Sequence, residues 1–206
     1  MTHVSLFSGI GGLDLAAEWA GFETILQVEK DPYCRAVLKK HWPEVERAGD
    51  IRGLSLSGLV GCRQAQRIDG SEERSLESDV WIIAENVGHT WRRWVPAVRR
   101  DLWSIGYASV SVRVRASEIG ASHDRHRAFV VANADSELVR EFSRRWQRSG
   151  WEMAQELAGT RDWSPKRLGD YNGVPHRLDR LRALGNAVVP QQAYPIFKAI
   201  AEVEEK

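Results

Sequence analysis

The sequence predicts one α/β domain with a mostly parallel sheet and helices on both faces. The chain has 206 residues, 43% of them hydrophobic, which is enough to bury one sizeable core. Its first half alternates short apolar runs with helical patterns, an order typical of βαβ units. No segment repeats or is low in complexity. A parallel sheet with crossover helices therefore accounts best for this half of the chain.

Hydrophobic periodicity places the elements in chain order. A strand is expected at 4–7, a helix from about Gly11 to Trp19, a strand at 24–28 and a helix at 32–41. Further strands are expected at 80–84, 108–116 and 128–132, with a turn at 123–126 before the last of them. Charged and tryptophan-containing text at 135–170 predicts a peripheral region outside the sheet. The last helix should begin near Pro190 or Gln191 and run through Ile200.

Charge and cysteine content limit the classes of protein. The net charge of +1 gives no global basic signal, so any contact with nucleic acid must depend on local clusters. Two cysteines, Cys34 and Cys62, cannot build a disulfide framework, and the scattered histidines lack the spacing of a zinc site. No apolar run approaches a membrane span, and Met1 leads directly into an apolar strand. We expect a soluble cytoplasmic protein without a secretory signal.

A glycine-rich turn follows the first predicted strand and opens a helix, at Phe7–Gly12. Glycines let the backbone turn tightly and approach a ligand, while the helix N-terminus offers free N–H groups. Glu29 follows about 20 positions later at the end of the second strand, where a carboxylate can accept bonds from ribose hydroxyls. The turn predicts a nucleotide-like ligand, with a plain tight turn as the alternative.

Asp50 stands where a third strand would end, and Ile51 follows it. The carboxylate could accept an adenine amino proton while Ile51 packs on the ring. A helix cap or turn residue is the alternative for Asp50.

Six ordered motifs extend this pattern over almost the whole chain. They lie at Leu6–Leu13, Val28–Tyr33, Gly49–Ile51, Glu85–Val87, Arg125–Arg127 and Leu184–Pro190. In this order and spacing the chain resembles the DNA cytosine-5 methyltransferases, especially their compact bacterial and phage members of restriction–modification systems. The resemblance implies a Rossmann-like, S-adenosylmethionine-dependent methyltransferase fold, shortened in its middle.

The resemblance also implies the partners and the site. The cofactor is S-adenosylmethionine and the substrate is double-stranded DNA, with no membrane. The cofactor site would comprise Phe7, Gly9, Gly11, Gly12, Leu13, Glu29, Asp50, Ile51, Asn186 and Val188. The implied division of the chain is a core at 1–132, a reduced target-recognition or peripheral region at 133–182, and a C-terminal helix at 183–206 that returns to the core.

The chemistry explains why such a family needs these residue types. Carbon 5 of cytosine is weakly nucleophilic, so a thiolate must first add to carbon 6, and Cys62 is the candidate. Glu85, just after an apolar strand, is the implied acid at the N3 edge of the base. Arg125 and Arg127 would hold the base carbonyl or a phosphate by charge-assisted bonds. The base must be flipped out of the duplex to reach these groups.

The cysteine segment departs from the family pattern. The family carries Pro-Cys-Gln, whereas here Gly61 precedes Cys62 and Arg63 follows it, and the flanking gaps are short. Glycine in place of proline leaves the backbone before the thiol less restricted, although the neighbouring cation favours a thiolate. The alternative for Cys62 is an inert loop residue. Cys34, on a predicted helix, is expected to be a buried hydrophobic residue.

Two further alternatives stay open. Arg140, Arg144 and Arg148 share a helical face that could contact phosphates or be merely solvated, and the same choice applies to Arg92, Arg93, Arg99 and Arg100. The whole chain is either an active methyltransferase or a catalytically impaired relative that retains cofactor or DNA binding. With few residues left for target recognition, a partner chain that supplies the missing surface is a further expectation.

Overall fold

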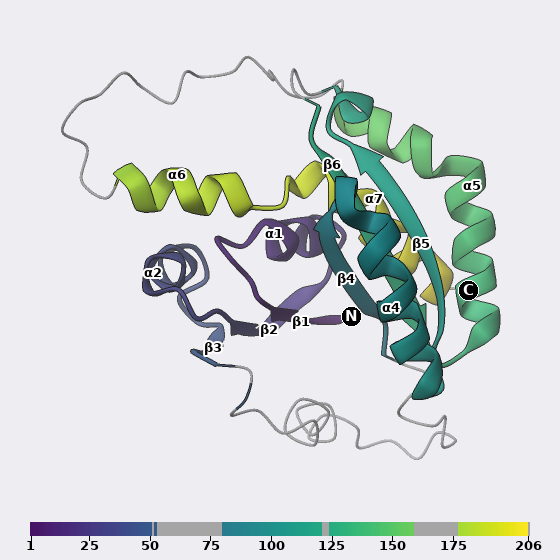
Figure 1. Cartoon of the computed structure of the whole chain (residues 1–206), viewed down its shortest axis with the longest axis horizontal. Helices are drawn as coiled ribbons and strands as arrows, with labels where there is room; N and C mark the ends of the chain where they lie inside the picture. The colour runs from purple at the N-terminus through teal and green to yellow at the C-terminus, as the bar shows by residue number, and fades with distance from the viewer. Residues whose placement is uncertain (51, 53–79, 121–123, 159–176, 206) are drawn as a thin grey trace. The chain divides into compact units, whose positions relative to one another are not determined.

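The computed structural model describes residues 1–50, 52, 80–120, 124–158 and 177–205 (Figure 1). The chain divides into two compact units, each considered by itself below. The first comprises Met1–Ser71 and Lys166–Tyr194, and the second comprises Glu72–Pro165 and Pro195–Lys206.

The first unit contains a parallel sheet of order β1-β2-β3. Its strands are β1 (Thr2–Leu6), β2 (Glu23–Val28) and β3 (Glu46–Ala48). They are joined through α1 (Gly12–Trp19) and α2 (Pro32–His41), and the unit also contains α6 (Arg177–Asn186). Parallel neighbours need such crossover connections, which explains the alternation in the sequence.

Local sequence determines both ends of α2. The Asp31 side chain caps the helix by accepting from the backbone N–H groups of Tyr33 and Cys34, and Pro32 occupies the first turn. Three basic residues fill the last turn, where positive charge interacts favourably with the negative end of the helix dipole.

A network of hydrogen-bonded polar side chains joins α1 to the sheet. The carboxylate of the fully buried Asp14 accepts hydrogen bonds from Ser5 Oγ at 2.9 Å and Gln27 Nε2 at 3.0 Å. Gln27 Oε1 in turn accepts from Arg47 Nη1 at 3.2 Å. One side chain from each strand thus contributes, and the network fixes the start of α1 against the sheet.

The second unit contains an antiparallel sheet of order β4-β6-β5. The strands are β4 (Ile82–Val87), β5 (Ala108–Arg115) and β6 (His126–Asn133). The unit also contains η3 (Gly88–Thr90), α4 (Trp91–Ser104), η4 (Ser117–Ile119) and α5 (Ser136–Ala158). Helix α7 (Pro190–Glu204) begins in the first unit and supplies its C-terminal part to the second.

Strand β6 is the centre of this unit, because all but its first residue are buried. Ala128, Val130 and Ala132 pack with Val95 and Leu102 of α4. Phe129 and Val131 alternate with them along the strand and are also fully buried. Both faces of β6 are therefore covered.

The α/β class with a parallel sheet and helices is confirmed. Strands predicted at 4–7, 24–28, 108–116 and 128–132 are present with ends shifted by a few residues, and the helix at 32–41 has the predicted bounds. The strand predicted at 80–84 is Ile82–Val87, so it includes Glu85. His126 was expected in a turn but begins β6, because it pairs with Arg115 in the antiparallel ladder.

The antiparallel order of the second sheet has a local cause. Helix α4 makes a crossover between β4 and β5, whereas only the short segment 116–125 joins β5 to β6. A short connection favours an antiparallel neighbour, and β6 pairs with both other strands. The helices α4 and α6 were not predicted from the sequence, and the region expected to be peripheral begins with α5.

Candidate functional site

The glycine-rich turn after β1 has an unusual backbone. Phe7, Gly9 and Gly11 all have positive φ, at 58°, 57° and 89°. Ser8 between them is buried, and its N–H donates to the Val28 carbonyl at 3.0 Å. A left-handed conformation is costly for a residue with a side chain, so Phe7 carries local strain of the kind that concentrates at functional sites.

Glu29 joins this turn to the end of β2. Its Oε2 accepts the Gly9 N–H and its Oε1 accepts the Asp31 N–H, both at 2.7 Å. Each carboxylate oxygen has a second lone pair, so the group can still accept from a ligand hydroxyl. The predicted pairing of Glu29 with the turn is a direct contact.

The turn also explains the last sequence motif. A Cβ on Gly12 would lie 2.3 Å from the Val188 carbonyl oxygen, so only glycine lets α1 begin this close to that segment. Asn186 is the last residue of α6 and is exposed, while Val188 and Leu13 are half-buried. The first and last motifs therefore meet within the first unit.

Two features leave room for a ligand beside the turn. The Phe7 side chain is 74% exposed, and a Cβ built on Gly9 would meet no atom within 4 Å. An exposed aromatic ring, an open glycine and a carboxylate with spare acceptor capacity fit a nucleoside.

Asp50 has a partner of its own. Its Oδ2 lies 2.6 Å from Arg52 Nη2, and its Oδ1 accepts the Arg52 N–H at 2.9 Å. The hydrogen bonds to Arg52 lower the pKa of Asp50. This geometry is a turn closed by the side chain, which corresponds to the alternative expected for Asp50. Ile51 lies outside the described residues.

The second unit brings together the other predicted polar residues. Glu85 on β4 and Arg127 on β6 are diagonal neighbours on one sheet face, because Glu85 pairs with Phe129 and Arg127 with Val87. Arg127 Nε lies 2.7 Å from Glu85 Oε1, and the two side chains are only 7% and 14% exposed, respectively. Arg125 is half-buried just before β6.

Burial and charge act on Glu85 in opposite directions. Desolvation raises its pKa above the ordinary value, and the Arg127 and Arg125 cations offset part of that rise. Burial and the neighbouring Arg127 cation lower the pKa of Arg125. Burial thus favours the protonated carboxyl group of Glu85, which is the form that can donate a proton.

Of the two predicted cysteines, the structure describes Cys34, whereas Cys62 lies outside the described residues. Cys34 is a buried free thiol on α2, and burial together with Asp31 and Glu29 raises its pKa to about 11. The prediction of a buried hydrophobic role for Cys34 is confirmed, since its thiolate is strongly disfavoured.

The arginines of α5 are largely neutralised. Arg140 pairs with Glu137 and Arg144 with Glu141, one turn apart on the helix. Such exposed pairs are typical of a solvated helix face. The structure therefore favours that alternative for this face, with Arg148 exposed on the same helix.

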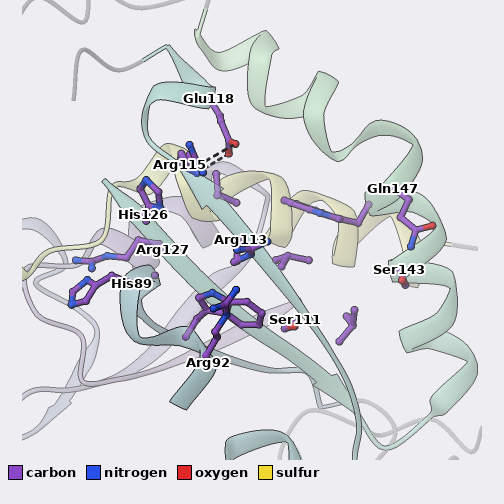
Figure 2. A pocket seen from close by; sticks show the side chains of 16 residues that line it. His89, Arg92, Ser111, Arg113, Arg115, Glu118, His126, Arg127, Ser143 and Gln147 are labelled. Atoms are coloured by element: carbon purple, nitrogen blue, oxygen red, sulfur yellow. Dashed lines mark hydrogen bonds and ion pairs between the residues drawn. The ribbon is translucent and has the colours of Figure 1, made fainter. Parts of the chain in front are cut away.

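A groove in the second unit contains residues that the sequence did not single out (Figure 2). Its volume is about 560 Å³ and it follows Val110–Arg115 of β5, between the start of α4 and the middle of α5. Arg113 and Arg115 line it, as does Arg127. The alternation of Ser, Val and Arg along β5 was the available signal, since it marks one polar face.

No described helix is long and apolar enough to span a membrane. No group of three or more His, Cys, Asp or Glu side chains in the described ranges is arranged to hold a metal ion.

Comparison with known proteins agrees with these motifs. Residues 1–63 match the family model described as C-5 cytosine-specific DNA methylase. The chain is 30% identical to type II methyltransferase M2.BsuMI of Bacillus subtilis, over 65% of this chain and 42% of that protein. It is also 30% identical to type II methyltransferase M.NgoPII of Neisseria gonorrhoeae, over 64% and 47%. The chain thus spans less than half the length of these relatives.

A solved structure supports the fold alone. The crystal structure of Spodoptera frugiperda DNMT2 superposes with a TM-score of 0.51 at 18% identity, covering 64% of this chain and 49% of that one. The ordered motifs, the glycine turn tied to Glu29 and the sequence matches agree: residues 1–63 match the C-5 cytosine-specific DNA methylase family, and the longer alignments are with type II methyltransferases.

Proposed function

We propose that this chain transfers a methyl group from S-adenosylmethionine to carbon 5 of cytosine in double-stranded DNA. The observation that carries the proposal is the buried pair of Glu85 and Arg127, 2.7 Å apart. Both residues belong to motifs by which the chain resembles the family, and burial gives the carboxyl group the raised pKa that an acid needs.

Each polar residue of the second unit has a role in this reaction. Glu85 would donate to N3 of the flipped cytosine as electron density moves into the ring. Arg127 and Arg125 would hold the base carbonyl or the adjacent phosphate. Cys62 would supply the thiolate that forms a bond to carbon 6 and leaves again when the carbon 5 proton is removed.

The first unit would hold the cofactor. Similarity to the family implies the use of S-adenosylmethionine, which supplies an electrophilic methyl group on sulfur. Phe7 would contact its adenosine part, Glu29 would accept from the ribose hydroxyls, and the open side of Gly9 would admit the ligand. Further candidates for this site are Gly11, Gly12, Leu13, Asp50, Ile51, Asn186 and Val188. Since both oxygens of Asp50 contact Arg52, that pair would have to open for Asp50 to bind adenine.

A partner polypeptide is part of the proposal. The chain spans 42% and 47% of its two relatives, and α5 offers few unpaired cations for reading DNA. Further sequence or a second chain would supply the target-recognition surface. We place the reaction in the cytoplasm, where bacterial DNA is found.

The direct test uses tritiated S-adenosylmethionine and cytosine-containing duplex DNA, with hydrolysis of the product to identify the methylated base. We expect labelled 5-methylcytosine from the wild-type protein and none from Cys62→Ser. The matched control is Cys34→Ala, which should retain transfer because the Cys34 thiol is buried with a pKa of about 11.

Other outcomes would contradict the proposal in separate ways. Label in Cys62→Ser would remove the nucleophile assignment. Absence of label in the wild type, together with calorimetric binding of S-adenosylhomocysteine, would establish the catalytically impaired relative instead.

A further inference from the structure

The groove along β5 has an open strand edge as its floor. In the described sheet β5 pairs with β6 alone. The Ser109 carbonyl accepts from Arg99 Nη2 at 2.9 Å, and the Arg115 N–H donates to Glu118 Oε2 at 2.8 Å, so both backbone groups point away from β6. Because backbone direction alternates along a strand, the N–H groups of Ser111 and Arg113 point outward too. The floor therefore offers the N–H donors of Ser111 and Arg113 beside the outward carbonyl groups of the same residues.

Guanidinium groups surround these donors. Figure 2 shows Arg92, Arg113 and Arg115 along the groove, with Arg127 also lining it. The groove's one carboxylate among its described lining residues is Glu118, whose Oε1 lies 3.9 Å from Arg115 Nε. The lining is therefore strongly cationic although the whole chain has a net charge of only +1.

Aromatic packing holds two of these cations. The Arg113 guanidinium carbon lies 4.6 Å from the centroid of the Trp91 ring, and that of Arg92 lies 5.8 Å from it. Cation–π contact orients a guanidinium without neutralising it, unlike an ion pair with a carboxylate. Arg92 and Arg113 thus keep their full charge for an anionic ligand.

The groove is continuous with the proposed catalytic pair. Arg127 lines the groove and also contacts Glu85. A chain of regularly spaced anions bound along β5 would therefore lead to the pair.

We infer that this groove binds the phosphodiester backbone of a DNA strand through Arg92, Arg113 and Arg115. Planar guanidinium groups match phosphate oxygens, and backbone contacts position a protein on DNA without reading its sequence. The inference deepens the proposed function, on which it rests, by assigning a second DNA contact outside the catalytic residues. An acidic extended peptide added to the β5 edge is the competing occupant.

The test is fluorescence anisotropy of the full chain with a short labelled duplex over a range of salt concentrations. For Arg92→Ala/Arg113→Ala we expect Kd to rise roughly tenfold and the slope of log K against log salt to fall by about 2. The matched control, Arg140→Ala/Arg144→Ala, removes the same charge from the solvated face of α5 outside the groove and should leave both quantities nearly unchanged.

A second variant acts in the opposite direction. Glu118→Gln keeps an oxygen for the Arg115 N–H but frees the Arg115 side chain, so binding should tighten about twofold to threefold. This gain cannot come from misfolding. Unchanged DNA binding in both groove variants would overturn the inference, as would equal losses in the groove and control double variants.

Competition separates the two occupants. Poly-glutamate could displace the duplex from the wild type but not from the groove variants, and bind more tightly than the duplex. That result would assign the edge to an acidic polypeptide and overturn the inference. Methyl transfer is measured separately. Groove-dependent DNA binding without methyl transfer would contradict the proposed function alone, whereas methyl transfer unaffected by the groove variants with unchanged Kd would contradict the groove alone.

Discussion

Glu85 Oε1 lies 2.7 Å from Arg127 Nε, across two antiparallel strands and largely out of contact with water. Burial raises the pKa of Glu85 despite this cation and the one on Arg125. Desolvation therefore disfavours the ionised carboxylate by more than the two neighbouring cations stabilise it, which is common for buried ion pairs.

The first prediction separates activity from stability. Glu85→Gln resembles the protonated side chain, so the free energy of unfolding at pH 7.5 should stay equal or rise, while methyl transfer should fall by a factor of about 10² or more. Urea denaturation and the tritium assay measure the two quantities. A large loss of stability in this variant would show that the ionised pair stabilises the fold.

The second prediction concerns pH. The folded-state pKa of Glu85 is raised above 4.5, so its contribution to stability is fully present below pH 4.5 and is lost as pH rises through the raised value. Relative to Glu85→Gln, the wild type should therefore lose stability as pH rises above about 4.5. The matched control Glu137→Gln, on an exposed helix face, should run parallel to the wild type over this range.

The third prediction removes the cation. Arg127→Met leaves Glu85 buried without its nearest positive charge, and at pH 8 the free energy of unfolding should fall by about 3 kcal/mol. At pH 5 the loss should be smaller, because Glu85 can then bind a proton. Urea titrations at both pH values decide this, and an equal loss at each would contradict the pairing.

The fourth prediction distinguishes two glycines. Gly12→Ala places a methyl group 2.3 Å from the Val188 carbonyl oxygen, so the backbone must shift and stability should fall by more than 2 kcal/mol. Gly9→Ala meets no atom within 4 Å, and its positive φ should cost only about 1–2 kcal/mol. Its methyl group points into the space proposed for the cofactor. The free energy of S-adenosylhomocysteine binding should therefore fall by more than the free energy of unfolding. Calorimetry that finds unchanged binding in Gly9→Ala would contradict this position for the ligand.

The fifth prediction concerns thiol reactivity. In Cys62→Ser the remaining thiol, Cys34, should resist iodoacetamide at pH 7.5, because it is buried and its pKa is about 11. Mass spectrometry should detect its modification only after urea unfolds the protein. Rapid labelling of the folded variant would show that α2 opens readily.

Much of the fold was predictable because local chemistry and periodicity agree. Asp31 and Pro32 mark the start of α2, and its basic last turn marks the end. Helix α4 carries apolar residues at helical spacing, including Trp91, Trp94, Val95, Val98 and Leu102, but its arginines and an internal proline obscured the pattern. Helix α4 forms because these residues pack on β6, and a short stretch of sequence does not reveal that contact.

The site was predictable where a motif defines it. Glu29 beside the glycine turn, and Glu85 near Arg127, are direct contacts. The partner of Asp50 was not foreseen, because an adjacent Arg52 can satisfy a carboxylate that sequence alone leaves open. Arg113 was missed as well, since only the packing of β5 beside Trp91 brings that cation into the groove.

Covalent trapping tests the central claim most directly. In the presence of S-adenosylmethionine, a duplex containing 5-fluorocytosine should form a stable adduct with the wild-type protein, because after methyl transfer carbon 5 carries fluorine in place of the proton whose removal releases the thiolate. Peptide mass spectrometry should place the adduct on Cys62, and Glu85→Gln should slow its formation. An adduct on another residue, or none while methyl transfer proceeds, would contradict the account.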